Sequence, residues 1–292
     1  MNEQKHVPVL AGEVIRCLKP KPGDRYLDLT AGRGGHARMV LDKIGPEGSA
    51  TLVDRDEEAI KALRDIFADD NRVEIIHSDF LSASKSLLKE GKSYDIVFAD
   101  LGVSSPHLDN PDRGFSFTRN GPLDMRMDRS SGLTAETIVN EYDADELAKI
   151  LKEYGEVRNA KKVAARLIDN RPYKTTAELA KKIVQFQSGK SRKHPATAVF
   201  QAVRIAVNDE LNLLEKSLDL WMALLSRMGR IGVISFHSLE DRLVKRAFKD
   251  YGGNRYDATL RILTKKAVKP GRDEVVFNPR SRSAKFRAAQ RK

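Results

Sequence analysis

Four aspartates stand at the ends of four predicted strands within the first hundred residues of the chain. They are Asp28, Asp54, Asp79 and Asp100. Short apolar stretches predict the strands, and helical apolar patterns separate them, which is typical of a parallel, doubly wound α/β sheet. Because the carboxyl ends of parallel strands meet at the edge where such sheets bind ligands, we expect these carboxylates to line one pocket. There they would attract a cation and accept hydrogen bonds from hydroxyl groups.

A glycine-rich turn follows the first of these strands. Residues 24–37 are DRYLDLTAGRGGHA, which predicts a short strand, a turn and the start of a helix. Gly32, Gly34 and Gly35 leave the backbone bare, so a ligand can lie against it. This arrangement is typical of a nucleotide-cofactor corner, and the spacing fits G-x-G-x-x-A. Two ligands suit it, a dinucleotide such as NAD and the methyl donor S-adenosylmethionine.

The carboxylates around the turn favour S-adenosylmethionine. Asp28, directly before the glycines, would repel a pyrophosphate and attract an ammonium or sulfonium group by about 1 kcal/mol or more. The alternative is that Asp28 only caps the turn. Asp54 lies 22 residues after Gly32, where a carboxylate accepts hydrogen bonds from the ribose hydroxyls that both cofactors carry. Phe80 could stack on an adenine or simply pack in the core.

Positive charge is concentrated in the last fifth of the 292-residue chain. Residues 230–292 hold 17 Lys and Arg against 6 Asp and Glu and so carry all of the formal net charge of +11. Such a basic segment favours nucleic acid as a partner over a merely solvated tail. We therefore predict RNA contacts by basic side chains near the C-terminus, namely Arg280, Arg282, Lys285 and Arg287.

The composition fits a globular protein of a reducing compartment. No apolar run approaches the ~20 residues of a membrane span, and MNEQKHVPVL lacks the apolar region of a signal peptide. The one cysteine, Cys17, cannot form an internal disulfide. His237 ends a predicted strand, but no other His or Cys is spaced to join it as a metal ligand. We expect a cytoplasmic protein without a membrane or metal partner.

The alternation of strands and helices is interrupted in the middle of the chain. A turn-rich segment and helical patterns predict a mainly helical substrate-recognition insertion, 107–211, within an α/β domain made of 1–106 and 212–292. Arg113 lies in the turn-rich segment, which could act as a substrate loop after the fourth strand. The basic loop 189–197 could meet RNA phosphates. The contacts predicted there are Lys190, Arg192, Lys193 and His194.

Sheet patterning then returns toward the C-terminus. Two overlapping helical patterns, 196–214 and 208–227, lead to a fifth strand at 230–236. Ser238 is the expected N-cap of the helix that follows. Residues 260–266 and the basic C-terminal segment predict a final antiparallel hairpin with an exposed cationic strand.

Motifs spread along almost the whole chain resemble one family. They include GRGGH in the glycine turn, DLGVSS after the fourth strand, RGFSF, GPLDMRMD, HPAT followed by FQAVRIAVN, VISFHSLEDR and NPRSRSAK. Several are long and have no general structural reason to occur together. On these motifs the chain resembles the RsmH (MraW) family of bacterial 16S rRNA methyltransferases, which use S-adenosylmethionine.

The resemblance implies a fold, an activity and a set of site residues. The fold would be a class I, Rossmann-like methyltransferase with an inserted helical domain. The activity would be methylation of the exocyclic N4 of a cytidine in the decoding region (P site) of 16S rRNA, free or in the small ribosomal subunit. The implied cofactor contacts are Gly34, Gly35 and His36 in the turn, Asp54 at the ribose, Phe80 near the adenine, and Asp100 near the methionine amine or the reacting atoms.

Three positions depart from the family pattern. His107 stands where the family commonly has glutamine, and because His can also donate or accept a hydrogen bond, we still expect it to contact the cofactor. Asn120 stands where aspartate is usual, and Ala198 where an arginine is expected after HPAT.

Asp100 is the residue that we expect to act on the target amine. Cytosine N4 is a poor nucleophile because its lone pair is delocalised, so an acceptor for the amino hydrogens helps. DLGVSS replaces the Asp/Asn/Ser-Pro-Pro-aromatic motif of many amino-methyltransferases, with Ser104 or Ser105 as possible assistants to Asp100. Two other functions stay open from the residues alone. They are an NAD-type oxidoreductase on the same corner and a non-catalytic RNA-binding ribosome-assembly factor.

Overall fold

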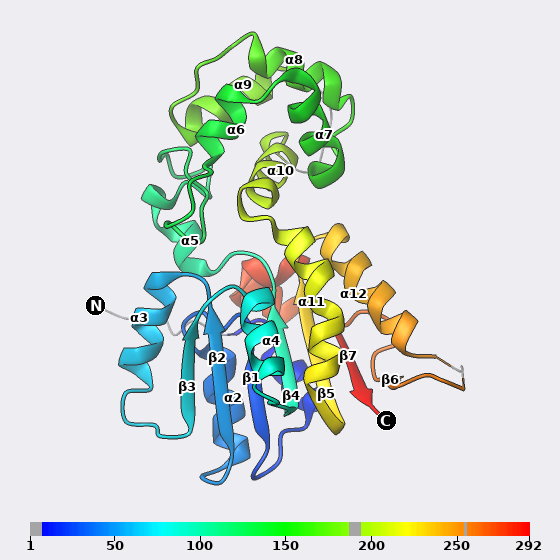
Figure 1. Ribbon diagram of the computed structural model, residues 1–292. Helices are drawn as coiled ribbons and strands as arrows, with labels where there is room; N and C mark the ends of the chain where they lie inside the picture. The colour runs from blue at the N-terminus through cyan, green and yellow to red at the C-terminus, as the bar shows by residue number, and fades with distance from the viewer. Residues whose placement is uncertain (1–7, 187–193, 254–255) are drawn as a thin grey trace. The chain divides into compact units, whose positions relative to one another are not determined.

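The computed structural model describes residues 8–186, 194–253 and 256–292 (Figure 1). The chain forms two compact units. Unit 1 consists of Met1–Gly102 and Leu211–Lys292, and unit 2 of Val103–Glu210. The unit boundaries therefore lie a few residues before those expected from the sequence patterns.

A seven-stranded sheet forms the centre of unit 1. Its strands are β1 (Arg25–Asp28), β2 (Ser49–Asp54), β3 (Val73–His77), β4 (Tyr94–Asp100), β5 (Leu225–Ser235), β6 (Leu260–Ile262) and β7 (Lys285–Arg291). The strand order is β3-β2-β1-β4-β5-β7-β6. The first five strands run parallel, and β7 is antiparallel to both β5 and β6. The predicted doubly wound α/β class is confirmed.

Helices cover both faces of this sheet because successive strand residues point to opposite faces. Tyr26 belongs to the core shared with α1 (Ala11–Leu18), α2 (Gly35–Ile44) and α3 (Glu57–Ile66). The next residue, Leu27, belongs to the opposite core. That face is covered by α4 (Phe80–Lys89), α11 (Glu210–Leu224) and α12 (Ser238–Tyr251).

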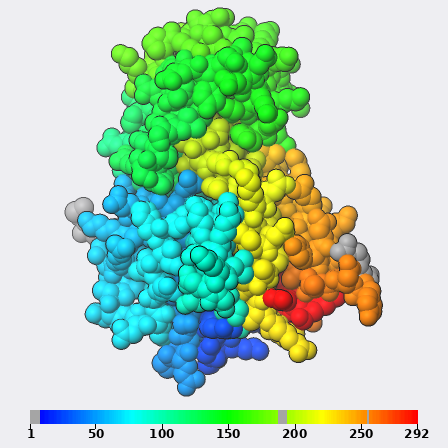
Figure 2. Space-filling view, viewed as in Figure 1, coloured from blue at the N-terminus to red at the C-terminus, as the bar shows by residue number. Residues whose placement is uncertain are grey.

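The helices α4 and α11 lie side by side on their face of the sheet. The indole nitrogen of Trp221 donates to Ser84 Oγ at 3.1 Å, which joins the two helices inside the core. Figure 2 shows their atoms packed next to each other over this face. The strand ends are therefore positioned by two filled cores.

The last strand differs from the prediction. β7 is not an exposed cationic strand, because it lies between β5 and β6 and buries Phe286, Ala288 and Ala289. Two of its basic side chains pair with Asp241, Arg287 at 2.7 Å and Lys285 at 3.5 Å, and the third, Arg291, donates to the Leu225 carbonyl.

Two local predictions near β5 are also wrong. The N-cap of α12 is His237 and not Ser238, since the His237 side chain accepts from the Glu240 backbone. The patterns at 196–214 and 208–227 belong to two helices that meet without overlap. The first ends at Asn208, because Asp209 adopts a left-handed φ of 50°.

Helices pack around a separate core in unit 2. They are α5 (Ser105–Asp109), the 3-10 turn η1 (Pro111–Arg113), α6 (Ala135–Glu141), α7 (Ala144–Gly155), α8 (Ala160–Ile168), α9 (Thr176–Phe186) and α10 (Ala196–Asn208). The turn-rich segment contributes Phe115, Leu123 and Met125 to this core. Asn120 accepts from the Ala177 amide at 3.2 Å.

Candidate cofactor site

The glycine turn joins β1 to α2 in unit 1. Gly32 and Gly34 have φ values of 54° and 73°, which favour glycine. A Cβ on Gly34 would lie 2.7 Å from Phe67 Cε2, and one on Gly35 would lie 2.9 Å from Pro8 Cγ. The nearest atom to a Cβ on Gly32 would be 4.0 Å away. Gly34 and Gly35 thus permit close packing, whereas Gly32 leaves space for a ligand.

Asp54 fixes the turn from the end of β2. One carboxylate oxygen accepts from the Gly32 amide at 2.8 Å, and the other accepts from the Asp56 amide at 2.9 Å. Each carboxylate oxygen has a second lone pair. Asp54 therefore fixes the turn, and its contact with the ribose hydroxyls stays a prediction.

Asp28 is buried at the end of β1, with 1% of its surface exposed. It accepts from the Tyr26 hydroxyl at 2.8 Å and from the Thr30 amide at 3.2 Å. Burial raises the pKa of Asp28 to about 6, against the partial opposition of these hydrogen bonds. The structure therefore shows the turn-capping role and also a carboxylate that a nearby cation would favour in its ionised form.

Asp100 and His36 meet between β4 and the first turn of α2. His36 Nε2 lies 3.6 Å from Asp100 Oδ2, and its ring packs 4.7 Å from the Phe98 ring. The Asp100 amide donates to Thr30 Oγ1 at 2.6 Å, which joins β4 to the turn. Tyr26 and Thr30 were missed from the sequence, although their spacing of two residues on either side of Asp28 is a usable signal.

Polar atoms at this corner are buried without hydrogen-bond partners. Among the described residues, they include Asp100 Oδ1 and both ring nitrogens of His36. Leaving such atoms unpaired is costly, so the corner suits a ligand with a donor for Asp100 Oδ1 and polar groups for the imidazole. The unpaired carboxylate oxygen, the bare Gly32 and the acceptors on Asp54 suit a nucleoside with a cationic group.

Comparison with known proteins places the chain in a family. The sequence model described as the MraW methylase family matches residues 3–292. The chain belongs to this methylase family. The dinucleotide oxidoreductase is thereby excluded as an interpretation of the glycine corner, and the strand order is that of the class I methyltransferase fold that the resemblance implies.

Relatives match the methylase over nearly its whole length. "Ribosomal RNA small subunit methyltransferase H" of Cyanothece sp. (strain PCC 7425 / ATCC 29141) is 46% identical over 288 residues, covering 98% of this chain and 94% of the relative. The protein of the same name from Gloeothece citriformis is 47% identical over 292 residues, with the same coverage. A solved SAM-dependent O-methyltransferase from Thermotoga maritima is 12% identical, with a TM-score of 0.45. The match covers 100% of this chain and 69% of the Thermotoga chain.

One further acid and one aromatic of unit 1 have structural roles, and the acid, Asp79, lies beyond the end of β3 and not at it as expected. Asp79 caps α4 by accepting from the Leu81 and Ser82 amides, both at 2.9 Å. The Phe80 ring lies edge-on to Trp221, with centroids 5.5 Å apart. Core packing of Phe80 is therefore observed, and its contact with an adenine stays a prediction.

His107 belongs to unit 2. Its Nδ1 accepts from the Ser104 amide at 3.2 Å in the capping box of α5, and its ring lies 4.8 Å from that of Phe115. These contacts lock the imidazole in place within unit 2. The contact of His107 with the cofactor stays a prediction.

The predicted RNA contacts divide into groups by their burial. The RNA contact predicted for Arg113 is wrong, because only 1% of this residue is exposed. Its guanidinium donates to the carbonyls of Arg126 and Met127 at 3.1 and 2.9 Å. Lys285 and Arg287 are partly buried and pair with Asp241, and their contact with RNA stays a prediction. The exposed side chains are Arg280, Arg282 and His194. The predictions for Lys190, Arg192 and Lys193 lie outside the described residues.

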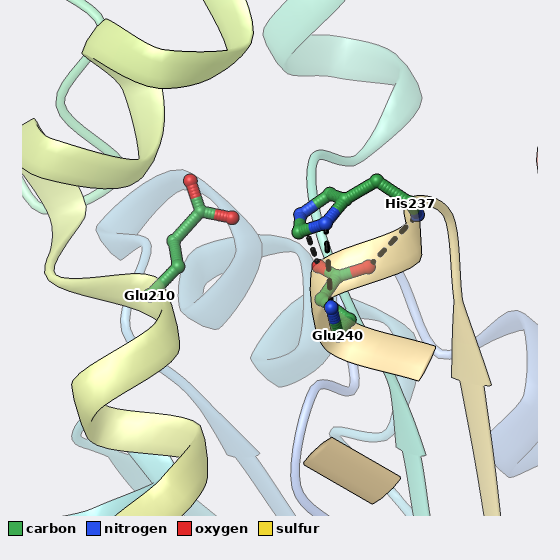
Figure 3. A group of neighbouring side chains, drawn as sticks. All are labelled: Glu210, His237 and Glu240. Atoms are coloured by element: carbon green, nitrogen blue, oxygen red, sulfur yellow. Dashed lines mark hydrogen bonds and ion pairs between the residues drawn. The ribbon is translucent and has the colours of Figure 1, made fainter. Parts of the chain in front are cut away.

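His237 has a structural role at the end of β5 (Figure 3). The Glu240 amide donates to His237 Nδ1 at 3.4 Å, and Glu240 Oε2 accepts from the Phe236 amide at 2.8 Å. His237 Nε2 lies 3.2 Å from Glu240 Oε1. The pair therefore closes the first turn of α12, as a reciprocal capping box does.

No helix in the described part of the chain is both long and apolar enough to span a membrane.

Proposed function

We propose that this methylase transfers a methyl group from S-adenosylmethionine to the exocyclic N4 of a cytidine in the decoding region of 16S rRNA. The observation that carries the donor is the corner of unit 1, where Asp100 Oδ1 is buried without a partner beside the bare Gly32 backbone. The small-subunit RNA substrate is supported by relatives named for it at 46–47% identity.

The residues of unit 1 fit the parts of the donor. Asp100 offers its unpaired oxygen to the methionine ammonium, and ionised Asp28 adds negative charge near it. Asp54 accepts from the ribose hydroxyls, and Gly32 allows the backbone to approach the nucleoside. When bound, the donor supplies a methyl group on a sulfonium, which is already a good leaving centre.

The protein then has to align the amine and receive its proton. Alignment for in-line displacement contributes most of the rate when the leaving group is good. As the new N–C bond forms and the C–S bond breaks, the amine loses one proton. Asp100, at the end of β4, is the carboxylate that we assign to accept a hydrogen bond from the amino group and to receive this proton, through Oδ2, the oxygen that the ammonium does not take.

A C5 methylation route is disfavoured by the position of Cys17, the one cysteine of the sequence. That route needs a thiolate that adds to the base. Cys17 lies in α1, where burial raises the pKa of its thiol, and its carbonyl accepts from Arg230 at 2.8 Å. It is therefore placed and protonated for packing and not for attack.

The experiment is transfer of labelled methyl groups to small-subunit RNA from cells that lack this modification. After digestion, we expect the label on N4-methylcytidine and none with the Asp100→Ala protein. Label on C5 of cytosine or on a ribose hydroxyl would overturn the N4 assignment. RNA binding without any methyl transfer would favour the non-catalytic assembly factor.

A further inference from the structure

A short helix of unit 1 presents apolar side chains to solvent. In α13 (Arg272–Phe277), no residue is buried, and Val276 and Phe277 are 73% and 87% exposed. The 3-10 turn η2 (Pro279–Ser283) follows directly. Two adjacent apolar side chains kept in water gain nothing for folding, so they indicate a contact surface.

The segment is nevertheless firmly attached to unit 1. Glu274 Oε1 accepts from the Leu10 amide at 2.7 Å, across more than 260 residues of sequence. Ser281 is fully buried and donates from Oγ to the Asn278 carbonyl at 2.8 Å, and Ala284 lies in the core. The Phe277 ring is therefore held outward by an anchored backbone and not by a loose end.

The charge around the ring is positive. Arg272, Arg280 and Arg282 are exposed in the same segment, against the exposed Asp273 and the half-buried Glu274, so the segment keeps a net positive charge. An exposed aromatic ring beside arginines is the combination by which proteins bind single-stranded RNA, with bases stacked on the ring and phosphates on the guanidinium groups.

The same charges disfavour a second copy of the chain as the occupant. A symmetric contact would bring the Arg272, Arg280 and Arg282 side chains of both copies together. Each copy also carries a formal net charge of +11, all of it within residues 230–292. Like charges at close range are destabilising, whereas an RNA strand is complementary.

We propose that α13 and η2 form an RNA-docking surface, on which a base stacks on Phe277 and the phosphates contact Arg280 and Arg282. This inference rests on the proposed function for its substrate class. The surface is joined to the cofactor corner through Leu10, two residues after Pro8, whose ring packs against Gly35. RNA held there is docked on the unit that carries the methyl donor site.

The test measures RNA affinity without any methyl donor, so that it is independent of catalysis. The probe is a transcribed, labelled fragment of small-subunit RNA that contains the decoding-region hairpin. Phe277→Ala is compared with Tyr256→Ala, since Tyr256 is fully exposed too but lies outside the segment. Arg282→Gln is compared with Lys61→Gln, an exposed cation on α3.

We expect Phe277→Ala to weaken RNA binding about 5- to 100-fold, and Tyr256→Ala to leave it unchanged. Arg282→Gln should lower the slope of log affinity against log salt by about one, with no such change for Lys61→Gln. Binding of S-adenosylmethionine should be the same in all four proteins.

Wild-type RNA affinity in the Phe277→Ala and Arg282→Gln proteins would overturn the inference. So would a loss of self-association in Phe277→Ala, measured by sedimentation, because the surface would then be an interface between copies. Failure of the proposed function has a different signature, since the wild-type protein would transfer no methyl group whatever its RNA affinity.

Discussion

Two buried polar clusters, one in each unit, differ in how completely their atoms are paired. In unit 2, Asn208 accepts from the Met127 amide at 2.8 Å and donates to the carbonyls of Met125 and Arg204 at 2.7 and 2.9 Å. In unit 1, Asp100 and His36 retain buried atoms without partners. A saturated cluster stabilises the fold, whereas an unsaturated one is held ready for a ligand.

The largest effect on stability is expected at the saturated cluster. Asn208→Ala leaves the Met127 amide and the Met125 carbonyl buried without partners, at about 1–3 kcal/mol each, so we expect a loss of about 4 kcal/mol. Denaturant unfolding measures it. Asn120→Ala, at an exposed asparagine with one amide contact, should cost about 1 kcal/mol or less. Equal losses in the two variants would contradict the comparison.

Two glycines of the same turn in unit 1 allow a second comparison, because Gly34 packs against a neighbour and Gly32 faces open space. Gly34→Ala combines a positive φ with a Cβ 2.7 Å from Phe67, so we expect it to cost about 3 kcal/mol of stability. Gly32→Ala meets no neighbour closer than 4.0 Å and should cost about 1 kcal/mol, but it should weaken cofactor binding more strongly than stability. Thermal unfolding and calorimetric titration separate the two effects. The comparison would fail if Gly32→Ala bound S-adenosylmethionine normally.

The buried Asp28 carboxyl makes the free energy of unfolding depend on pH, with a smaller expected effect than that of Asn208→Ala. Its pKa is raised from 3.8 to about 6, so the folded protein holds this proton more tightly than the unfolded chain. Stability from this group is therefore fully present below pH ~4 and is lost as pH rises through ~6, by about 3 kcal/mol in total and by about 2 kcal/mol between pH 4.5 and 7. Asp28→Asn should remove this loss, as measured by unfolding at pH 4.5 and 7.

The same carboxyl links cofactor affinity to pH. Because the ionised form attracts a cation, wild-type affinity for S-adenosylmethionine should rise as pH passes upward through ~6. In the Asp28→Asn protein this rise should be reduced. Identical pH profiles in the two proteins would show that Asp28 does not contribute to the site.

The strand ends were predictable because local patterns decide them. Apolar stretches, the glycines and the aspartates that follow placed Asp28, Asp54 and Asp100 at the ends of β1, β2 and β4. Other features depend on distant partners. The burial of Arg113 depends on carbonyls 13 and 14 residues away, which no local pattern reveals.

The position of β7 also depends on distant partners and was not predictable from local sequence. Its sequence KFRAAQR reads as cationic and exposed, but pairing with β5 on one side and β6 on the other buries every apolar residue. The exposure of Phe277 was equally invisible, because an aromatic next to Val276 looks like core in sequence. Which apolar residues stay outside depends on the packing of whole elements and not on local spacing.

The measurement that tests the central claim most directly compares Asp100, at the end of β4, with Asp79, the N-cap of α4. Titration calorimetry with S-adenosylmethionine and denaturant unfolding are applied to Asp100→Ala and Asp79→Ala. We predict that Asp100→Ala binds at least about 30-fold more weakly with undiminished stability, and that Asp79→Ala, which removes a helix cap, loses about 1 kcal/mol of stability and keeps its affinity. Wild-type affinity in Asp100→Ala, or a loss of stability there equal to that of Asp79→Ala, would contradict the account.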